Sequence, residues 1–468
     1  MFVTIFFTIF LVTGVTVGCE KQAISFDITE EDIFLEKSTI NIKLPDCPKS
    51  SIKLNLSHMG INNITDNLTD SPFFTCLNLE NNDIVSLQQN IFQEMTNLTY
   101  LNLANNQIPD HDLLSFGGHE KLQTLILDGN VPSYSHTLHV RGEFPKLEKL
   151  FLREMLIEFL PNDFGSHFPS LTHFYLSNNI VNVSNLYNFV NTLPTSVTHL
   201  YLEQNGISVF RSSVLNNITE LLLDGNEFKV LDRSFDMTLD PSNTPTLEHL
   251  SARSCKISKI GTTAFYGTYN LTTLDLSNNY IEQIPDGLFN GVSNLKNLSL
   301  SSNFLNEIPR AISLSCLRIM HLNYNRIQNT SQLSNLTGLE ILSLRGNNIT
   351  HLGECVFGNM TNLRELDLAE NNIKYFMPNA MVNLKFFNLN FNYIDNIEAL
   401  FLRSDFSLEH LYLKGNPLSR ITVNSLMNMP ENLTLYIGPM RHPGIHSRIL
   451  KLEKFDKRNN KMILLEKE

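Results

Sequence analysis

Hydrophobic and polar positions follow one frame that recurs along most of the chain. Residues 271–281 read Leu-Thr-Thr-Leu-Asp-Leu-Ser-Asn-Asn-Tyr-Ile, or L-x-x-L-x-L-x-x-N-x-I. Leu274 and Leu276 alternate with polar residues, which is the period of a short strand with one apolar face. Asn279 follows where the chain turns away from the strand, and its side-chain amide can bond backbone groups that lack a ladder partner. One such unit cannot bury its apolar face alone, so we expect the units to stack.

The frame starts sixteen times, at intervals of 21 to 29 residues. The unit starts are Ser51, Phe74, Leu98, Leu122, Leu147, Leu171, Val197, Ile218, Leu247, Leu271, Leu295, Leu317, Leu339, Leu363, Leu384 and Leu408. Asparagine fills the ninth position in thirteen units, and Met59, Met155 and Cys255 fill it in the others. This repetition predicts an α/β solenoid with about 16 parallel strands on its concave side.

The ninth and eighth positions should differ in their sensitivity to substitution. Asn279→Ala should leave buried backbone groups without partners, at a cost of ~1–3 kcal/mol. Asn278 lies one position earlier and should face solvent, so alanine there should cost no more than ~0.5 kcal/mol.

The second half of many units carries a phenylalanine, and these rings should align as a spine on the convex side. They are Phe92, Phe116, Phe164, Phe189, Phe235, Phe265, Phe289 and Phe357. Repeats of about 24 residues with this frame and a late phenylalanine resemble the typical class of extracellular leucine-rich repeat proteins. Toll-type receptor ectodomains, chaoptin-like adhesion proteins and secreted insect immune proteins are built this way. The resemblance covers residues 51–432 and implies a leucine-rich repeat horseshoe, but it says little about the ligand.

The two ends of the chain lie outside the repeat frame. Residues 2–17 are apolar and uncharged, so we interpret residues 1–18 as a cleaved secretory signal, with an uncleaved anchor and a lipoprotein signal as alternatives. Residues 19–50 should cap the first repeat, and 433–468 should form a capping hairpin or a tail. No later segment is apolar enough to span a bilayer, so we expect a secreted, extracellular product without a transmembrane span.

Composition narrows the range of functions. The chain of 468 residues is 42% hydrophobic and carries a net charge of -12, which argues against nucleic acid or an anionic membrane as the main partner. The cysteines and histidines do not have zinc-site spacing, and neither a phosphate-binding glycine loop nor a nucleophile elbow is present. We therefore expect no enzymatic activity, no cofactor and no metal.

Three of the six cysteines, Cys19, Cys47 and Cys76, lie near the N-terminus. One pair among them would tie down the cap in an oxidising compartment. Because Cys76 should face the concave surface, we expect the pair to be Cys19–Cys47. Cys255 replaces a ninth-position asparagine and should be a buried free thiol.

The chain also carries thirteen Asn-x-Ser/Thr sequons, of which an Asn-rich repeat creates some by chance. They are Asn55, Asn63, Asn67, Asn97, Asn182, Asn217, Asn270, Asn297, Asn329, Asn335, Asn348, Asn359 and Asn432. Any sequon that carries a glycan must be exposed. Asn55 and Asn297 fall on strand positions that face the concave side, where a glycan would obstruct that side locally.

Positions three and five of each unit point away from the leucine core, and most carry polar residues. A contiguous aromatic and histidine strip interrupts this pattern at Phe151, His173, Tyr175, His199, Tyr201, Leu222 and His249. We expect these side chains to be exposed and to form a contact site, since a large aromatic patch on a secreted monomer usually marks one. The alternatives are that side chains from flank loops or a partner protomer cover the strip, or that the rings only pack on one another along the ladder.

These patterns favour a secreted, glycosylated recognition or adaptor protein that binds a protein or glycan ligand through its concave face. Immunity or cell-surface signalling would suit such a protein. The alternative is a structural or adhesive extracellular scaffold that self-associates as a homo-oligomer. In either case the histidines would make binding sensitive to pH between about 5 and 8.

Overall fold

The computed structural model does not describe every residue. It describes residues 45–49, 51–64, 71–109, 111–130, 136–181, 189, 192–211, 215, 217–232, 238–310, 314–352, 356–357, 359–376, 382–400, 406–419, 429–430, 433–438, 448–456 and 461–467. The expected signal segment lies outside these residues. Among the described residues, no helix has the length and apolar character needed to cross a membrane.

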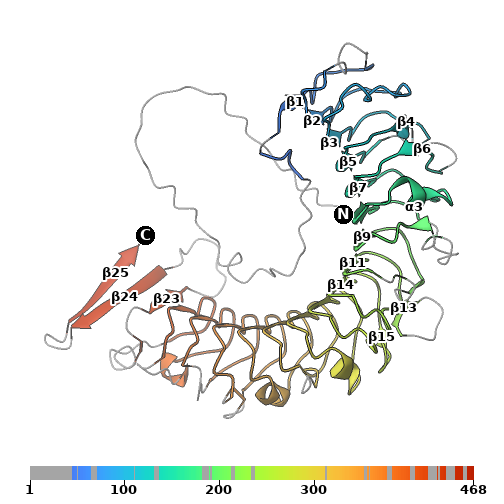
Figure 1. Ribbon diagram of the computed structural model, residues 1–468. Coiled ribbons are helices and arrows are strands. Elements are labelled where there is room, and N and C mark those ends of the chain that lie inside the picture. Colours follow the sequence, from blue (N-terminus) through green and yellow to red (C-terminus); the bar gives the residue numbers. More distant parts are fainter. Residues whose placement is uncertain are drawn as a thin grey trace, which may run out of the picture. The chain divides into compact units, whose positions relative to one another are not determined.

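Short parallel strands, one from each repeat, pair in chain order to form one long sheet (Figure 1). They are β1 (Lys53–Asn55), β2 (Cys76–Asn78), β3 (Tyr100–Asn102), β5 (Thr124–Ile126), β7 (Lys149–Phe151), β8 (His173–Tyr175), β9 (His199–Tyr201), β11 (Glu220–Leu222), β14 (His249–Ser251), β16 (Thr273–Asp275), β17 (Asn297–Ser299), β18 (Ile319–His321), β19 (Ile341–Ser343), β20 (Glu365–Asp367), β21 (Phe386–Asn388), β22 (His410–Tyr412) and β23 (Thr434–Ile437). Each of the sixteen predicted units supplies one of the strands up to β22, and β23 extends the sheet by one further strand.

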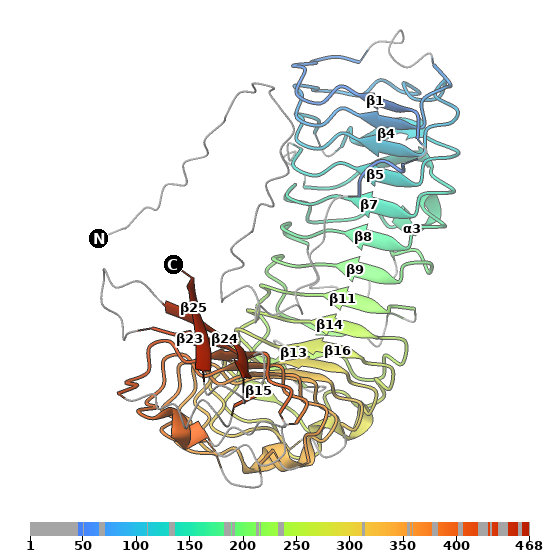
Figure 2. The ribbon, with the colours of Figure 1, turned by 90° about the vertical axis from the view of Figure 1, so that its left-hand side faces the viewer.

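The register of the sheet keeps equivalent repeat positions side by side. Leu274 of β16 pairs with Leu250 of β14 and with Leu298 of β17, so the fourth-position residues form one continuous row. These leucines point into a core that runs through all the repeats. Positions three and five form the opposite side of the sheet, here called the strand face, which lines the concave side of the stacked turns (Figure 2).

The phenylalanine spine is confirmed where it is described. The rings of Phe92 and Phe116 meet edge to face at 5.3 Å, and Phe144 continues the chain of contacts to Phe168. Every predicted spine residue except Phe235, which lies outside the described residues, is buried. These rings fill the space between turns where the backbone is irregular.

Further elements lie on the far side of the repeats from the strand face (Figure 1). They are β4 (Leu114–Gly118), β6 (Val140–Glu143), β10 (Phe210–Arg211), β12 (Val230–Leu231), β13 (Thr238–Asp240), β15 (Lys259–Ile260), α3 (Phe164–His167) and the 3-10 helices η2 (Leu288–Gly291), η3 (Ser331–Asn335) and η4 (Ile397–Leu400). The longest repeat contributes β13, which pairs in parallel with both β10 and β12. The extra residues of that repeat therefore form a strand of a second small sheet.

The ninth-position asparagines hold successive turns together, as predicted. The side-chain oxygen of Asn279 accepts hydrogen bonds from the backbone N–H groups of Cys255 and Ile257, both at 3.0 Å. Its amide nitrogen donates to the carbonyl groups of Ala252 and Leu276 at 2.8 and 2.9 Å. Asn279 thus bonds backbone of its own turn and of the preceding one.

The eighth position has a left-handed backbone in every repeat. The residues with positive φ at this position are His58, Asn81, Asn105, Gly129, Glu154, Asn178, Gln204, Gly225, Ser254, Asn278, Ser302, Tyr324, Gly346, Glu370, Phe391 and Gly415. L-residues adopt this region at a cost, and glycine and asparagine tolerate it best. The eighth position is therefore constrained by the backbone although its side chain faces solvent.

The predicted Cys19–Cys47 disulfide is wrong, because Cys47 bonds Cys76. The reason is the path of the N-terminal segment, which crosses onto the strand face. There the Tyr100 hydroxyl donates a 3.0 Å hydrogen bond to the carbonyl oxygen of Pro45, and Lys53 Nζ donates to that of Cys47. This path brings Cys47 to the strand face, so the orientation of Cys76 favours the bond. Cys19 lies outside the described residues.

At the other end, β24 (Arg448–Asp456) and β25 (Lys461–Lys467) form an antiparallel hairpin. β24 also pairs antiparallel with β23. Of the two possibilities for the C-terminal residues, the structure thus has the hairpin.

Candidate binding face

Three stacked rings mark the strand face between β7 and β9. Phe151 and Tyr175 stack with their centroids 3.9 Å apart, and Tyr175 and Tyr201 stack at 4.2 Å with an interplanar angle of 2°. We call Phe151, Tyr175 and Tyr201 the ring ladder. The strands place equivalent side chains at nearly the spacing of stacked aromatic rings, so the sheet itself aligns these rings face to face.

The prediction that the ring ladder is exposed is wrong. Phe151, Tyr175 and Tyr201 are only 1%, 6% and 4% exposed, and Leu222 beside them is 4% exposed. Each ring is covered by the ring of the neighbouring turn. Together with Cys76, Tyr100 and Ile126, these residues form a second apolar cluster, separate from the leucine core. The fifth-position rings therefore pack on one another along the ladder, which was one of the alternatives to an exposed contact site.

The third-position residues beside the ladder are more accessible. His173, His199, Glu220 and His249 are half-buried and occupy adjacent register positions on β8, β9, β11 and β14. We call these four residues the histidine row. The imidazole rings of His173 and His199 stack at 4.0 Å, so this row has the same sheet-imposed alignment as the ring ladder.

Threonine hydroxyl groups hold the imidazole rings of His173 and His199. Thr172 Oγ1 lies 3.0 Å from the carbonyl oxygen of Glu148 and 2.8 Å from His173 Nδ1. Thr198 stands in the same relation to the Thr172 carbonyl oxygen and to His199 Nδ1. These contacts engage the Nδ1 side of both rings and so fix the ring orientation.

Burial sets the charge of the row. Desolvation, followed by the nearby His199 and Lys149, lowers the pKa of His173 to about 4. Desolvation also lowers the pKa of His199, against the opposing effect of Glu220, whose Oε2 lies 3.9 Å from His199 Nε2. Both imidazoles are thus mainly neutral at pH 7. Protonation of His173 requires more acidic conditions than the pH range of 5 to 8 predicted from the sequence, and the pKa of His199 is shifted in the same direction.

Acidic groups border the ladder on its other side, at the seventh position. Burial raises the pKa of Glu203 to about 7, although Ser177 Oγ donates a 2.6 Å hydrogen bond to its Oε2. Burial likewise raises the pKa of Asp224. Tyr201 connects the ladder instead to the histidine row, since its hydroxyl donates to Glu220 Oε1 at 2.9 Å.

The N-terminal edge of this region is closed by a salt bridge. The guanidinium group of Arg153 bonds Asp128 Oδ2 through Nε at 2.9 Å and Nη2 at 2.7 Å, and its Cζ lies 5.5 Å from the centroid of the Phe151 ring. Arg153 thus covers the outer face of the ladder at Phe151, and Asp128 balances its charge.

A second aromatic group, not predicted from the sequence, lies at the C-terminal end of the strand face. The rings of Tyr412 and Tyr436 stack at 4.2 Å, and those of Phe386 and His410 at 4.9 Å. His410 Nδ1 lies 3.1 Å from the Tyr436 hydroxyl. The signal was present in the sequence, because these residues occupy the same third and fifth positions as the predicted strip.

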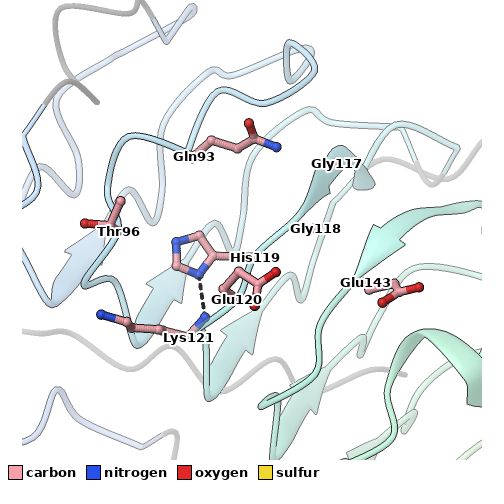
Figure 3. Close-up of a pocket in the computed structure, with 8 residues that line it drawn as sticks. All are labelled: Gln93, Thr96, Gly117, Gly118, His119, Glu120, Lys121 and Glu143. Atoms are coloured by element: carbon pink, nitrogen blue, oxygen red, sulfur yellow. Dashed lines mark hydrogen bonds between the residues drawn. The ribbon is translucent and has the colours of Figure 1, made fainter.

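A pocket of about 440 Å³ lies away from the strand face, beside β4 and β6 (Figure 3). It is lined by Gln93, Thr96, Gly117, Gly118, His119, Glu120, Lys121 and Glu143. His119 Nε2 bonds the Met95 carbonyl oxygen and Nδ1 accepts from the Lys121 N–H, both at 3.2 Å. Burial lowers the pKa of His119, consistent with this neutral tautomer. Both nitrogens are engaged, so His119 serves the structure of the loop and not general-base chemistry.

Most of the described sequons are exposed. The exposed ones are Asn55, Asn63, Asn97, Asn217, Asn270, Asn329, Asn335, Asn348 and Asn359. Asn297 is half-buried on β17, while Asn67, Asn182 and Asn432 lie outside the described residues.

Cys255 is a buried free thiol, as predicted, and burial raises its pKa to about 12. The described part of the chain holds no group of three or more His, Cys, Asp or Glu side chains placed to bind a metal ion.

Comparison with known proteins supports the repeat assignment. A leucine-rich repeat model matches residues 75–131, 245–305, 269–327 and 337–394, and a second matches residues 407–429. Mouse podocan is 25% identical over 82% of the chain and 74% of podocan. Mouse CD180 antigen is 25% identical over 81% of the chain, which spans 62% of that protein. Rat lumican is 29% identical over 69% of the chain and 74% of lumican.

Solved structures share the fold at lower identity. The Drosophila Toll–Spatzle complex matches with a TM-score of 0.56 and 21% identity, covering 79% of this chain and 54% of that one. The TLR13–ssRNA13 complex matches with a TM-score of 0.52 and 20% identity, covering 81% of this chain and 62% of that one. The chain is thus a leucine-rich repeat protein with the horseshoe fold, similar to podocan, lumican, CD180 antigen and Toll-like receptor ectodomains.

Proposed function

We propose that the protein is a secreted, glycosylated recognition or adaptor protein that binds another protein through the strand face between β7 and β14. The observation that carries this proposal is the histidine row. Its side chains are half-buried, ordered by stacking and hydrogen bonds, and supported by the buried ring ladder. Side chains held in this way lose little conformational entropy when a partner binds.

The chemistry of the row favours a polar partner surface. The imidazoles of His173 and His199 are held through Nδ1, and Glu220 adds a carboxylate, which accepts hydrogen bonds, within the same row. Lys149 and Thr273 flank the row on β7 and β16, so no dense positive patch is present there. With the net charge of -12, this argues for a protein and against a nucleic acid.

The structural neighbours support partner binding without naming the partner. The Toll structure is a complex with Spatzle, and the TLR13 structure is a complex with ssRNA13. Those partners belong to those proteins. We take from them only that a fold of this kind can carry a recognition surface.

The proposal is tested with a variant that changes the accessible row and leaves the buried ladder intact. We choose His173→Ser with His249→Ser, and His351→Ser as the control because His351 is exposed and lies outside positions three and five. Each purified protein is cross-linked in extracellular fluid from the source tissue, and captured proteins are identified by mass spectrometry. We expect one partner to be captured by the wild type and the control but lost from the double variant.

Two outcomes would contradict this proposal. A partner that the double variant retains would move the binding site away from the histidine row. Capture of this chain alone, confirmed as self-association by sedimentation velocity of the purified protein, would instead support the scaffold alternative.

A further inference from the structure

A row of exposed and half-buried residues follows the tenth repeat position along one flank of the solenoid. Tyr280, Phe304, Arg326 and Asn348 occupy this position in four consecutive turns. Their backbone N–H groups each donate to the eleventh-position carbonyl of the preceding turn, over 2.7 to 3.0 Å. Successive members are therefore neighbours, separated by about one strand spacing of ~4.8 Å.

The first three members form a stacked surface in which Tyr280 and Arg326 are exposed and Phe304 is half-buried. The rings of Tyr280 and Phe304 are nearly parallel, with centroids 6.0 Å apart, and the Arg326 guanidinium carbon lies 4.4 Å from the Phe304 centroid. Tyr280 is 50% exposed and Tyr324, at the eighth position beside Arg326, is 49% exposed. Leaving such rings in water gives up favourable burial, so a covering group is expected.

The fourth member identifies the covering group. Asn348 starts the sequon Asn348-Ile349-Thr350, and both Asn348 and Thr350 are exposed. The Tyr324 ring lies against Gly346, two residues before the sequon, where a side-chain carbon could not fit. An exposed aromatic ring thus lies against the backbone two residues before a candidate glycan acceptor.

Other exposed sequons are engaged differently. Asn97 Nδ2 donates to the Pro72 carbonyl at 3.0 Å, and Asn217 Nδ2 donates to that of Thr195 at 2.7 Å. These two amides bridge adjacent turns on the flank that precedes the strands. Their nitrogen atoms already have a structural role, which sets them apart from an acceptor asparagine placed next to exposed rings.

We propose that an N-linked glycan on Asn348 lies back along this row and packs its first sugars on Tyr324, Arg326 and Phe304. The C–H groups of a pyranose face are apolar enough to cover an aromatic ring, while its hydroxyl groups stay in water. Phe304 lies two turns from Asn348, ~10 Å at the strand spacing, which a chain of a few sugars spans. This inference rests on the proposed secretion of the protein, since N-glycosylation of this kind occurs on that route.

The test starts with glycopeptide mass spectrometry of the secreted protein, which reads each sequon separately. Thermal unfolding is then measured for Asn348→Gln in the wild type and in a Phe304→Ser, Tyr324→Ser background. We expect removal of the glycan to lower the Tm by at least about 2 °C in the wild type and to have no effect once the rings are gone. Asn335→Gln, at an exposed sequon on η3, serves as the matched control. We expect this substitution to change the Tm by the same amount in both backgrounds.

Enzymatic release adds a second measurement that does not depend on stability. We expect a peptide N-glycosidase to release the Asn348 glycan several-fold more slowly than the Asn335 glycan from the folded protein, and the ring variant to remove this difference. An unmodified Asn348 in a protein that is glycosylated at other sequons would overturn this inference but not the proposed secretion. Equal Tm changes in both backgrounds, with equal release rates, would also overturn it. Absence of sugar from every sequon would overturn both the inference and the proposed secretion.

Discussion

The thiol of Cys255 occupies the place of a ladder asparagine directly before Asn279. Asn279 accepts the backbone N–H of Cys255 at 3.0 Å, whereas the Cys255 thiol itself donates only to the carbonyl groups of Leu223 and Arg253, at 3.1 and 3.3 Å. A thiol is a weak donor and a weak acceptor. The asparagine ladder is therefore weakened at this turn.

Replacing Cys255 by asparagine should stabilise the protein. The side chain is of similar size, and its amide would restore stronger hydrogen bonds to the preceding turn, worth about 1 kcal/mol. The free energy of unfolding from chemical denaturation checks this, with Cys316→Asn as a control at a cysteine outside the ladder. A lower stability for Cys255→Asn would show that the packing around the buried thiol does not accommodate an amide.

The eighth and ninth positions should both resist alanine, for different reasons. Asn279→Ala removes the side chain that satisfies buried backbone groups, at ~1–3 kcal/mol. Asn278 has φ +55°, so Asn278→Ala should cost about 1 kcal/mol, more than the solvent-facing position suggested. Asn278→Gly is the control, because glycine adopts this conformation without strain. If alanine and glycine were equivalent at 278 in thermal melts, backbone strain would not be the cause.

The ring ladder should contribute to stability as well as shape. Tyr175→Ala with Tyr201→Ala removes two buried rings, so we expect a loss of roughly 3 kcal/mol or more and not the normal folding expected of exposed residues. Tyr201→Phe keeps the stack and loses only the hydrogen bond to Glu220, at about 1 kcal/mol. Denaturation of the three proteins measures both effects. A double variant as stable as the wild type would contradict the observed burial.

Glu203 should make stability depend on pH near neutrality. Burial raises its folded-state pKa to about 7, above an unfolded value of about 4.3. The folded state then binds more protons than the unfolded state between these two values, so stability falls as pH rises through this range. Glu203→Gln should remove this loss, with a gain in stability at pH 8 and little change at pH 4. Glu340→Gln, at a strand-flank position whose side chain is 39% exposed, is the control. A gain that does not vary with pH would rule out the carboxyl group as its source.

The disulfide should connect the N-terminal segment to β2. Peptide mapping without reduction should recover one cross-linked peptide containing Cys47 and Cys76. Their separation of 29 residues gives an expected loss of about 3 kcal/mol for Cys76→Ser. A cross-linked peptide containing Cys19 in place of Cys76 would restore the pairing expected from the sequence.

The sequence by itself determined the repeat architecture, because the repeat is local and strict. Leu274, Leu276 and Asn279 each carry one part of the frame, and a period-two strand leaves no choice of which residues enter the core. The strand register, the spine and the buried Cys255 all follow from that frame. The same rule placed the aromatic strip on the correct face of the sheet.

Tertiary structure alone decided how accessible that strip is. Tyr175 points away from the core as the frame requires, yet its neighbours one turn before and after cover both of its faces. Burial of this kind depends on spacing between turns, which a single repeat does not contain. Likewise, the path that brings Cys47 to Cys76 belongs to a segment outside the frame. Local patterns determine the direction in which a side chain points, but only the packing between turns determines which side chains contact and cover it.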